Sequence, residues 1–296
     1  MKYILLDLEW NNAYFPKIRG WVNEIVEFGA VKLDENFREI DRFNMIVRSS
    51  LTKRLSGRFK ELTGMSNETM LNGVKFSEAL ESYKKWAGED SLTLTWSDTD
   101  LYVLYDNCLY FTNSPENAKI GLYTDLQKYF HFELAAMGKT EKNQISLSNA
   151  AILFDIDTND QTLHHAVDDS AISAAILRKC YKPEHFEQFI FNTNATGFYE
   201  RLRFKSYFIR NLQDENIDKS QLFIRCPECN CRAKRITKYK FNNRWFIAGF
   251  FCKDCNLKFK GLISFRKLYD RVEVKKKTRP FEEAAKLKVK EKTTTT

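Results

Sequence analysis

The chain has 296 residues, of which 43% are hydrophobic, which suits one large globular domain and a small one. No apolar run reaches the length of a membrane span, and Asp7 and Glu9 interrupt the first ten residues where a secretory signal needs an uncharged core, so we expect a cytoplasmic protein without membrane partners. Five of the seven cysteines lie between Cys226 and Cys255, which favours metal binding over a disulfide framework.

The net charge of +8 is unevenly distributed along the chain. Residues 221–296 contain 21 Lys and Arg against 7 Asp and Glu, whereas residues 1–220 contain 26 against 32. The C-terminal part therefore carries +14 and the rest carries −6. This asymmetry favours a polyanionic partner, although a solvated basic tail would give the same count.

The first elements are predicted to be strands. Residues 3–10 (YILLDLEW) have the composition of a buried strand, and a polar, irregular stretch follows through Gly20. Residues 23–35 and 41–48 are typical of two further strands, close enough to the first to form an antiparallel meander.

Helices and strands then alternate. A helix is predicted over 76–88 and ends at Gly88, a strand over 91–96, and a helix over 98–111. Residues 118–132 suit a strand followed by a helix, and helices are predicted over 146–156 and 164–181. This order predicts a mixed α/β layer fold.

The chain divides into four predicted segments. Residues 1–182 form the main domain, 183–220 a charged helical connector after Pro183, and 221–274 a small cysteine-containing module. Residues 275–296 have too little apolar content to pack and are expected to be disordered.

The first strand ends in two acids, Asp7 and Glu9, which share one side because side chains alternate along a strand. Burying two like charges is costly unless a cation neutralises them, and carboxylate oxygens are the ligands that Mg²⁺ and Mn²⁺ prefer. Further acids begin later helices, namely Asp98, Asp100, Asp168 and Asp169. Several of these acids could therefore converge on one metal site.

These residues resemble the three motifs of the DEDD-type 3′–5′ exonucleases. The motifs are "DLE" on the first strand, an Asp that opens a helix after a later strand, and "HHAVDDSA". The histidine-containing subclass has the spacing His-x-Ala-x-x-Asp, which matches His164, Ala166 and Asp169. The segments "EIVEFGAVKLDENF" and "LTGMSNETM" are also similar to the family, so the resemblance covers roughly residues 1–180.

The resemblance implies a ribonuclease H-like fold with a five-stranded mixed sheet flanked by helices. It also implies that Asp7, Glu9, Asp100 and Asp169 hold two Mg²⁺ or Mn²⁺ ions, and that His164 is the general base. The implied activity is metal-dependent 3′–5′ hydrolysis of single-stranded RNA or DNA that releases nucleoside 5′-monophosphates. Two metal ions can activate a water and stabilise the leaving oxygen, and a neutral imidazole can accept the proton.

Some assignments have alternatives. Asp100 is preferred to Asp98, which could simply cap the helix, because Asp100 follows Trp96 by four residues as the family pattern requires. The spacing to Ala166 and Asp169 favours His164 over His165. Asp168 is expected to lie beside Asp169 without binding a metal ion.

Trp10, Asn11 and Asn12 occupy the positions where the family lines its substrate pocket. They differ from the small hydroxyl residues often found there, so the preference for RNA or DNA stays open.

The cysteines form two knuckles, Cys226-x-x-Cys229 and Cys252-x-x-Cys255, which together predict one structural Zn²⁺ in a zinc ribbon. Cys231 is a less suitable substitute for Cys229, because its pair spacing is five residues. Cys108 and Cys180 are expected in the core.

The predicted ribbon interleaves cations with aromatic residues, a combination that favours binding of a single strand. The cations are Arg232, Lys234, Arg235, Lys238, Lys240 and Arg244, and the aromatic residues are Tyr239, Phe241, Trp245 and Phe246. The alternative is that the rings only fill a small core.

Two other functions compete with an exonuclease. One is a catalytically silent nucleic-acid-binding adaptor, which would not need the full set of acids. The other is a nuclease that its ribbon recruits to a protein partner.

Overall fold

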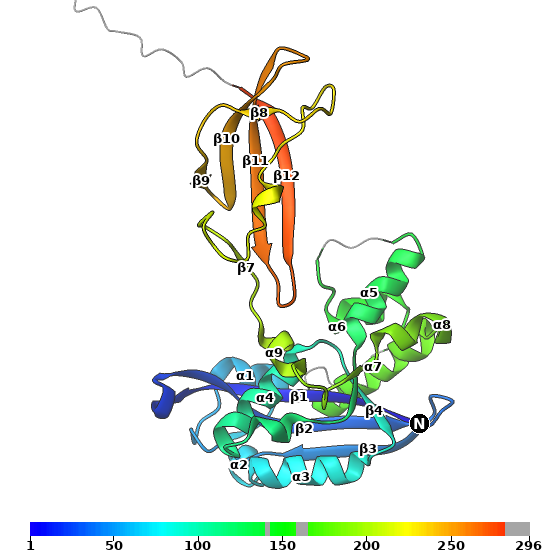
Figure 1. Ribbon diagram of the computed structural model, residues 1–296. Helices are drawn as coiled ribbons and strands as arrows, with labels where there is room; N and C mark the ends of the chain where they lie inside the picture. Colours follow the sequence, from blue (N-terminus) through cyan, green and yellow to red (C-terminus); the bar gives the residue numbers. More distant parts are fainter. Residues whose placement is uncertain (140–142, 158–164, 282–296) are drawn as a thin grey trace, which may run out of the picture. The chain divides into compact units, whose positions relative to one another are not determined.

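A computed structural model describes residues 1–139, 143–157 and 165–281 of the chain (Figure 1). The chain forms two compact units, an N-terminal unit, Met1–Arg203, and a C-terminal unit, Phe204–Thr296. No helix of the described residues is long and apolar enough to cross a membrane.

The N-terminal unit is built on a mixed sheet with the strand order β3-β2-β1-β4-β5-β6. β1, β2 and β3 form the expected antiparallel meander, β4 and β5 run parallel to β1, and β6 is antiparallel to β5. The strands are β1 (Lys2–Phe15), β2 (Gly20–Leu33), β3 (Glu39–Ile46), β4 (Ser91–Thr95), β5 (Leu122–Asp125) and β6 (Phe191–Asn192). The sheet therefore has the five expected strands and a sixth, two-residue strand from the predicted connector.

Helices cover both faces of this sheet (Figure 1). Helices α3 and α4 pack on one face, and α5, α6 and α7 pack on the other. The α-helices of this unit are α1 (Gly57–Thr63), α2 (Asn67–Leu71), α3 (Phe76–Ala87), α4 (Thr99–Phe111), α5 (Leu126–Ala136), α6 (Leu147–Leu153), α7 (Ala166–Cys180), α8 (Pro183–Phe186) and α9 (Phe198–Arg203). Short 3-10 turns lie at η1 (Pro16–Ile18), η2 (Pro115–Ala118) and η3 (Glu187–Phe189).

Strand β1 is buried on both faces because it lies in the middle of the sheet. Ile4, Leu6 and Leu8 belong to the core under α3 and α4, whereas Tyr3 and Leu5 belong to the core under α5, α6 and α7. This two-sided burial explains why the strand is an almost unbroken apolar run.

The C-terminal unit is a second sheet with the order β12-β11-β10-β8, in which β7 also pairs with β11 and β9 with β10. Its core contains Phe246, Phe250, Phe259, Ile263 and Phe265. The elements are β7 (Tyr207–Phe208), η4 (Lys219–Gln221), β8 (Lys234–Arg235), β9 (Lys240–Asn242), β10 (Trp245–Cys252), β11 (Leu257–Lys267) and β12 (Val272–Pro280).

Three expectations about local structure were wrong. The polar stretch after Trp10 is not irregular, because its backbone pairs with β2 as far as Phe15. The segment expected to be a helical connector is partly strand and divides between the two units. Residues 275–280 are not a disordered tail, because they pair with β11 along its length, and charged side chains are tolerated there on an edge strand. Phe281 follows the strand, and residues 282–296 of that predicted tail lie outside the described residues.

Candidate functional site

Asp7 and Glu9 continue the row of β1 side chains that begins with Tyr3 and Leu5. Alternation along the strand places all four on the face covered by α5, α6 and α7. The apolar part of the row is sealed in the core, and the two partly buried acids lie where the strand leaves that core. The register with β2 shifts directly after Glu9, so a bulge separates this pair from the outer part of the hairpin.

Helix α7 brings a third carboxylate to the same place. Its first turn crosses β2 at Gly29, the residue paired with Asp7. A Cβ at Gly29 would lie 2.2 Å from the carbonyl carbon of Ala166, so only glycine permits this approach. Ser170 Oγ also donates a 3.1 Å hydrogen bond to the Gly29 carbonyl oxygen. As a result, carboxylate oxygens of Asp7, Glu9 and Asp169 lie within 4.8 Å of one another.

Asp100 approaches from the first turn of α4. β1 and β4 are paired only as far as Leu5 and Leu94, and the Leu8 N–H beyond this point donates to Asp100 Oδ1 at 3.2 Å. Ligand sites commonly lie outside the carboxyl ends of parallel strands that separate in this way. Asp100 is outside the 4.8 Å group of three acids, but it lies close enough to raise the pKa of Asp7.

The electrostatics of these acids fit a divalent cation. Burial and then the repulsion of Asp100, Glu9, Asp169 and Glu27 raise the pKa of Asp7 well above its usual range. Burial, followed by the repulsion of Asp169, Glu27 and Asp100, raises the pKa of Glu9 to about 8. Burial raises the pKa of Asp100 to about 7. A bound cation would remove this repulsion, and oxygen-only donors of this kind suit Mg²⁺ or Mn²⁺.

A fifth acid at this site, Glu27, was not among the predicted residues. It lies on β2 directly opposite Glu9 and is only 1% exposed. Its Oε2 has no hydrogen-bond partner among the described residues. Burial raises its pKa, while nearby His165 and a hydrogen bond from Asn44 oppose the change. The register of the β1–β2 hairpin would have revealed Glu27, but the bulge after Glu9 makes that register hard to read from sequence.

The competing residues of the second and third motifs have different surroundings. Asp98 precedes α4 without capping it through its side chain, and it forms a 2.6 Å ion pair with Lys128. His165 occupies the position before α7 and faces Glu27. Asp168 neighbours Asp169 in the first turn of α7 and also lies close to Glu27. The expected general base, His164, lies outside the described residues.

The residues after the first motif have structural contacts. Asn11 is buried, and its Oδ1 accepts a 3.0 Å hydrogen bond from the Ser56 N–H. Asn12 Nδ2 donates to Asn23 Oδ1 at 3.1 Å across the hairpin. Trp10 packs against the core under α3 and α4. These contacts hold the hairpin and the loop before α1 together.

The C-terminal unit gathers the four expected cysteines. The Sγ atoms of Cys226, Cys229, Cys252 and Cys255 lie within 4.8 Å of one another, and Cys229 Sγ is 3.5 Å from Cys252 Sγ. This separation is close to the roughly 3.8 Å edge of a tetrahedron with Zn–S bonds of about 2.3 Å. The four thiols are therefore arranged compatibly with a structural zinc ion.

Each knuckle closes with an asparagine in the left-handed region, Asn230 at φ +59° and Asn256 at φ +51°. Asparagine tolerates this conformation better than most residues, so the turn after the second cysteine of each pair is favoured. Cys231 is exposed and groups with Cys229 and Asp254 instead of with the four thiols.

The other named residues of the predicted ribbon differ in how deeply their side chains are buried. Phe246 is buried in the small core and Tyr239 packs against it, whereas Trp245 is half-buried. The remaining ring, Phe241, and the six cations named for this segment are exposed. The aromatic residues therefore serve partly as core. Cys108 and Cys180 are buried in the N-terminal unit, as expected.

Comparisons with known proteins concern the family and the fold of this chain. The model of the exonuclease family matches residues 15–177, more than half of the chain. No curated protein matches the sequence significantly.

Among solved structures, cell-death related nuclease 4 is similar with a TM-score of 0.50 and 22% identity, covering 60% of this chain and 62% of that chain. A 3′-exonuclease solved in a study of histone mRNA stem-loop recognition gives 0.49 and 18%, covering 60% and 80%. Exonuclease I of E. coli with a dA16 oligonucleotide gives 0.49 and 12%, covering 84% and 54%.

The chain thus spans less than two thirds of cell-death related nuclease 4, and that likeness supports the ribonuclease H-like fold alone. The family match shows more than the fold, because it covers more than half of the chain. It extends from β2 to α7 and includes Asp100 and Asp169. The chain belongs to the exonuclease family.

Proposed function

We propose that this protein is a metal-dependent 3′–5′ exonuclease of the histidine-containing DEDD subclass. Its substrate is single-stranded RNA or DNA, and its products are nucleoside 5′-monophosphates. Asp7, Glu9, Asp100 and Asp169 hold two Mg²⁺ or Mn²⁺ ions, and the four-cysteine group holds one Zn²⁺.

The convergence of Asp7, Glu9 and Asp169 within 4.8 Å is the observation that carries this proposal. These residues come from β1 and α7, far apart in the sequence, and their mutual repulsion has no compensating Lys or Arg among the causes of the Asp7 and Glu9 pKa shifts. A fold does not retain such repulsion for stability, since buried like charges are costly. A bound metal cation would offset the repulsion and explain why the three carboxylates lie together.

The protein groups would share the work of hydrolysis. Bound divalent ions supply the charge that activates a water and stabilises the leaving 3′ oxygen. Asp7, Glu9 and Asp169 fix the position of those ions, and Asp100 is held against the Leu8 N–H, which orients its second oxygen. His164 accepts the proton of the attacking water, a role that its resemblance to the family motif supports.

The test compares Asp7→Asn with Asp98→Asn. Both changes remove one carboxylate charge, but Asp98 lies outside the cluster in an ion pair with Lys128. Single-stranded RNA and DNA 20-mers, labelled at the 5′ end, are incubated with each protein and Mn²⁺. We expect the parent and Asp98→Asn to produce a ladder that shortens from the 3′ end, and Asp7→Asn to be inactive.

Parental activity of Asp7→Asn in saturating Mn²⁺ would contradict the metal site. Immediate release of the 5′ label as a mononucleotide, without a ladder of intermediate lengths, would contradict the direction. If the parent protein leaves every strand intact but binds it, the silent adaptor takes the place of the exonuclease.

A further inference from the structure

The sheet of the C-terminal unit has two different faces. Along β10, alternate residues Phe246, Ala248, Phe250 and Cys252 point into the small core, so Trp245, Ile247, Gly249 and Phe251 point the other way. The registers of β11 and β12 extend this alternation across the sheet. We call the side opposite the core the outer face. It consists of the outward positions of β10, β11 and β12 together with Phe208 and Arg244.

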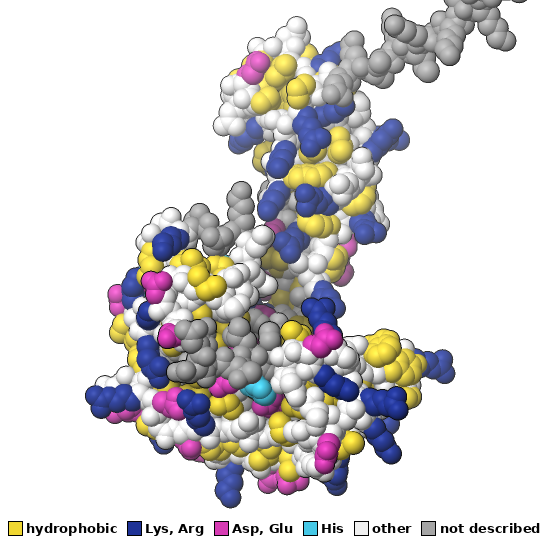
Figure 2. Space-filling view, turned by 180° about the vertical axis from the view of Figure 1, so that it is seen from behind, with side chains coloured by type: hydrophobic (Ala, Val, Ile, Leu, Met, Phe, Trp, Pro, Cys, Tyr) yellow, Lys and Arg dark blue, Asp and Glu magenta, His cyan; other side chains and the backbone are white. Residues whose placement is uncertain are grey.

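Charge on the outer face is strongly one-sided. The register places a single acid, Glu273, among the outward positions of β11 and β12. The cations at outward positions of these two strands are Lys258, Lys260, Arg266, Lys275, Lys277 and Arg279. In Figure 2 Lys and Arg side chains gather over the C-terminal unit, with hydrophobic side chains between them. Among the described residues, no carboxylate forms an ion pair with Arg244, Lys275 or Lys277.

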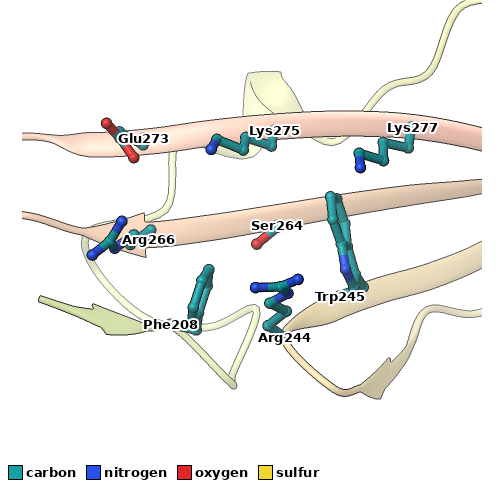
Figure 3. A pocket seen from close by; sticks show the side chains of 8 residues that line it. All are labelled: Phe208, Arg244, Trp245, Ser264, Arg266, Glu273, Lys275 and Lys277. Carbon is teal, nitrogen blue, oxygen red and sulfur yellow. The ribbon is translucent and has the colours of Figure 1, made fainter. Parts of the chain in front are cut away.

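Aromatic rings lie among these cations. Figure 3 shows Trp245 reaching across β11 toward Lys277, and Arg244 pointing toward Phe208. Lys277 Nζ is 5.5 Å from the centre of the Trp245 ring, and the Arg244 guanidinium is 5.6 Å from that of Phe208. Between these side chains lies a hollow of about 190 Å³. Each ring is thus presented beside a positive charge.

The spacing of the cations suits a linear polyanion. Lys275, Lys277 and Arg279 are two residues apart on β12, which corresponds to about 6.8 Å along a strand. This repeat is of the same order as the distance between phosphates along an extended single strand. β12 is also the edge of the sheet, so a chain of phosphates can follow it from the solvent side.

We propose that the outer face is a binding surface for single-stranded polynucleotide, with phosphates on Lys275, Lys277 and Arg279 and a base stacked on Trp245. Cations that follow the backbone and rings that accept bases of any sequence are the usual components of such surfaces. This inference rests on the proposed function in one respect, namely that the bound strand is the substrate. Most cations of the outer face lie beyond residues 232–246, and those of β12 belong to the segment that was expected to be a disordered tail.

The first experiment removes charge. Full-length protein carrying Asp7→Asn, in Ca²⁺ to prevent cleavage, is titrated with fluorescent U20 and dT20 over a series of NaCl concentrations. Lys275→Gln with Lys277→Gln is compared with Lys219→Gln and Lys253→Gln, two exposed cations outside the outer face. Two lost phosphate contacts should reduce the salt slope of log affinity by about 1.4 for the first pair. The second pair should keep the parental slope.

The second experiment tests stacking. Trp245→Leu should weaken binding between about 5-fold and 150-fold, and Trp245→Phe should weaken it much less because phenylalanine keeps a ring. Zinc content and circular dichroism of each variant establish that the unit is folded. Weakening on U20 alone or on dT20 alone would still support the surface and would identify its preferred sugar.

The proposal would be overturned if the two charge variants gave the same salt slope, or if folded Trp245→Leu and Trp245→Phe bound with equal affinity. The outer face would then be expected to bind a protein partner instead. A further assay distinguishes failure of the binding surface from failure of the proposed exonuclease function. It measures hydrolysis of a dinucleotide by the Lys275→Gln, Lys277→Gln protein in which Asp7 is intact. A variant that hydrolyses dinucleotide but binds U20 like its parent overturns only the surface. A parent protein that hydrolyses nothing overturns only the exonuclease.

Discussion

Replacing Gly29 with alanine should separate the two elements that build the carboxylate cluster. The new Cβ would meet the Ala166 carbonyl carbon at 2.2 Å, the Val167 nitrogen at 2.3 Å and the Ala166 Cβ at 2.5 Å. Ordinary contacts begin near 3.4 Å, so the first turn of α7 must move by about 1.2 Å. Asp169 belongs to that turn and must move with it, away from Asp7 and Glu9 on β1.

The size of the effect follows from this displacement. A shift of about 1 Å at a catalytic group can cost roughly 10²-fold in rate. Overpacking of a core typically costs about 1–3 kcal/mol, which corresponds to a fall in melting temperature of roughly 2–12 °C for a unit of this size. Loss of the hydrogen bond from Ser170 Oγ to the Gly29 carbonyl would add to the destabilisation.

The assay measures the initial rate of hydrolysis of a single-stranded 20-mer in Mn²⁺, the Mn²⁺ affinity by calorimetry, and thermal unfolding. Gly57→Ala is the matched control, because a Cβ at Gly57 meets nothing within 4 Å and its backbone conformation is ordinary. It should keep parental activity and affinity. Parental rate and Mn²⁺ affinity in folded Gly29→Ala would refute the view that the approach of α7 to β2 positions Asp169.

Three further predictions concern charge, proton transfer and zinc. The pKa values of Asp7 and Glu9 are raised in the folded, metal-free protein, so the folded state binds protons more tightly than the unfolded state. The melting temperature should therefore fall as the pH rises from about 4.5 through about 8. Mn²⁺ should reverse this fall, and Asp7→Asn should reduce it; a flat profile without metal would contradict the repulsion. His164→Ala should lower turnover by roughly 10²–10⁴-fold and keep the parental Mn²⁺ affinity. If His164→Ala keeps parental turnover and His165→Ala is inactive, the general base is His165 instead. Elemental analysis should find one zinc per chain, and Cys226→Ser should unfold the C-terminal unit while Cys231→Ser leaves it intact; equal effects of the two changes would show that Cys231 is a ligand.

Regular local patterns predicted much of this fold. The apolar run of β1 predicted a buried strand, helical spacing predicted α3 and α7, and the alternation along β1 placed Asp7 and Glu9 on one side. The pair spacing of the cysteines likewise predicted the grouping of four thiols. Such patterns are readable because each depends on the geometry of one element and its own side chains.

Element boundaries in the C-terminal unit were less predictable. Residues 275–280 are highly charged, and their composition alone favours a disordered tail. They form a strand because the edge of β11 supplies backbone partners along their whole length, while the side chains of Lys275, Lys277 and Arg279 stay exposed to solvent. Pairing with a distant segment thus outweighed local composition.

The sequence by itself determined which residue types could bind metal, and that Asp7 and Glu9 share a face, since alternation along a strand is a local property. Only the tertiary structure decided that α7 crosses β2 at Gly29, that Asp100 meets the Leu8 N–H, and that Glu27 faces Glu9. It also decided that six cations of β11 and β12 lie on the same face of a sheet as Trp245. These relations depend on strand register and on close packing between segments far apart in the chain, and neither is encoded in the periodicity of any single segment.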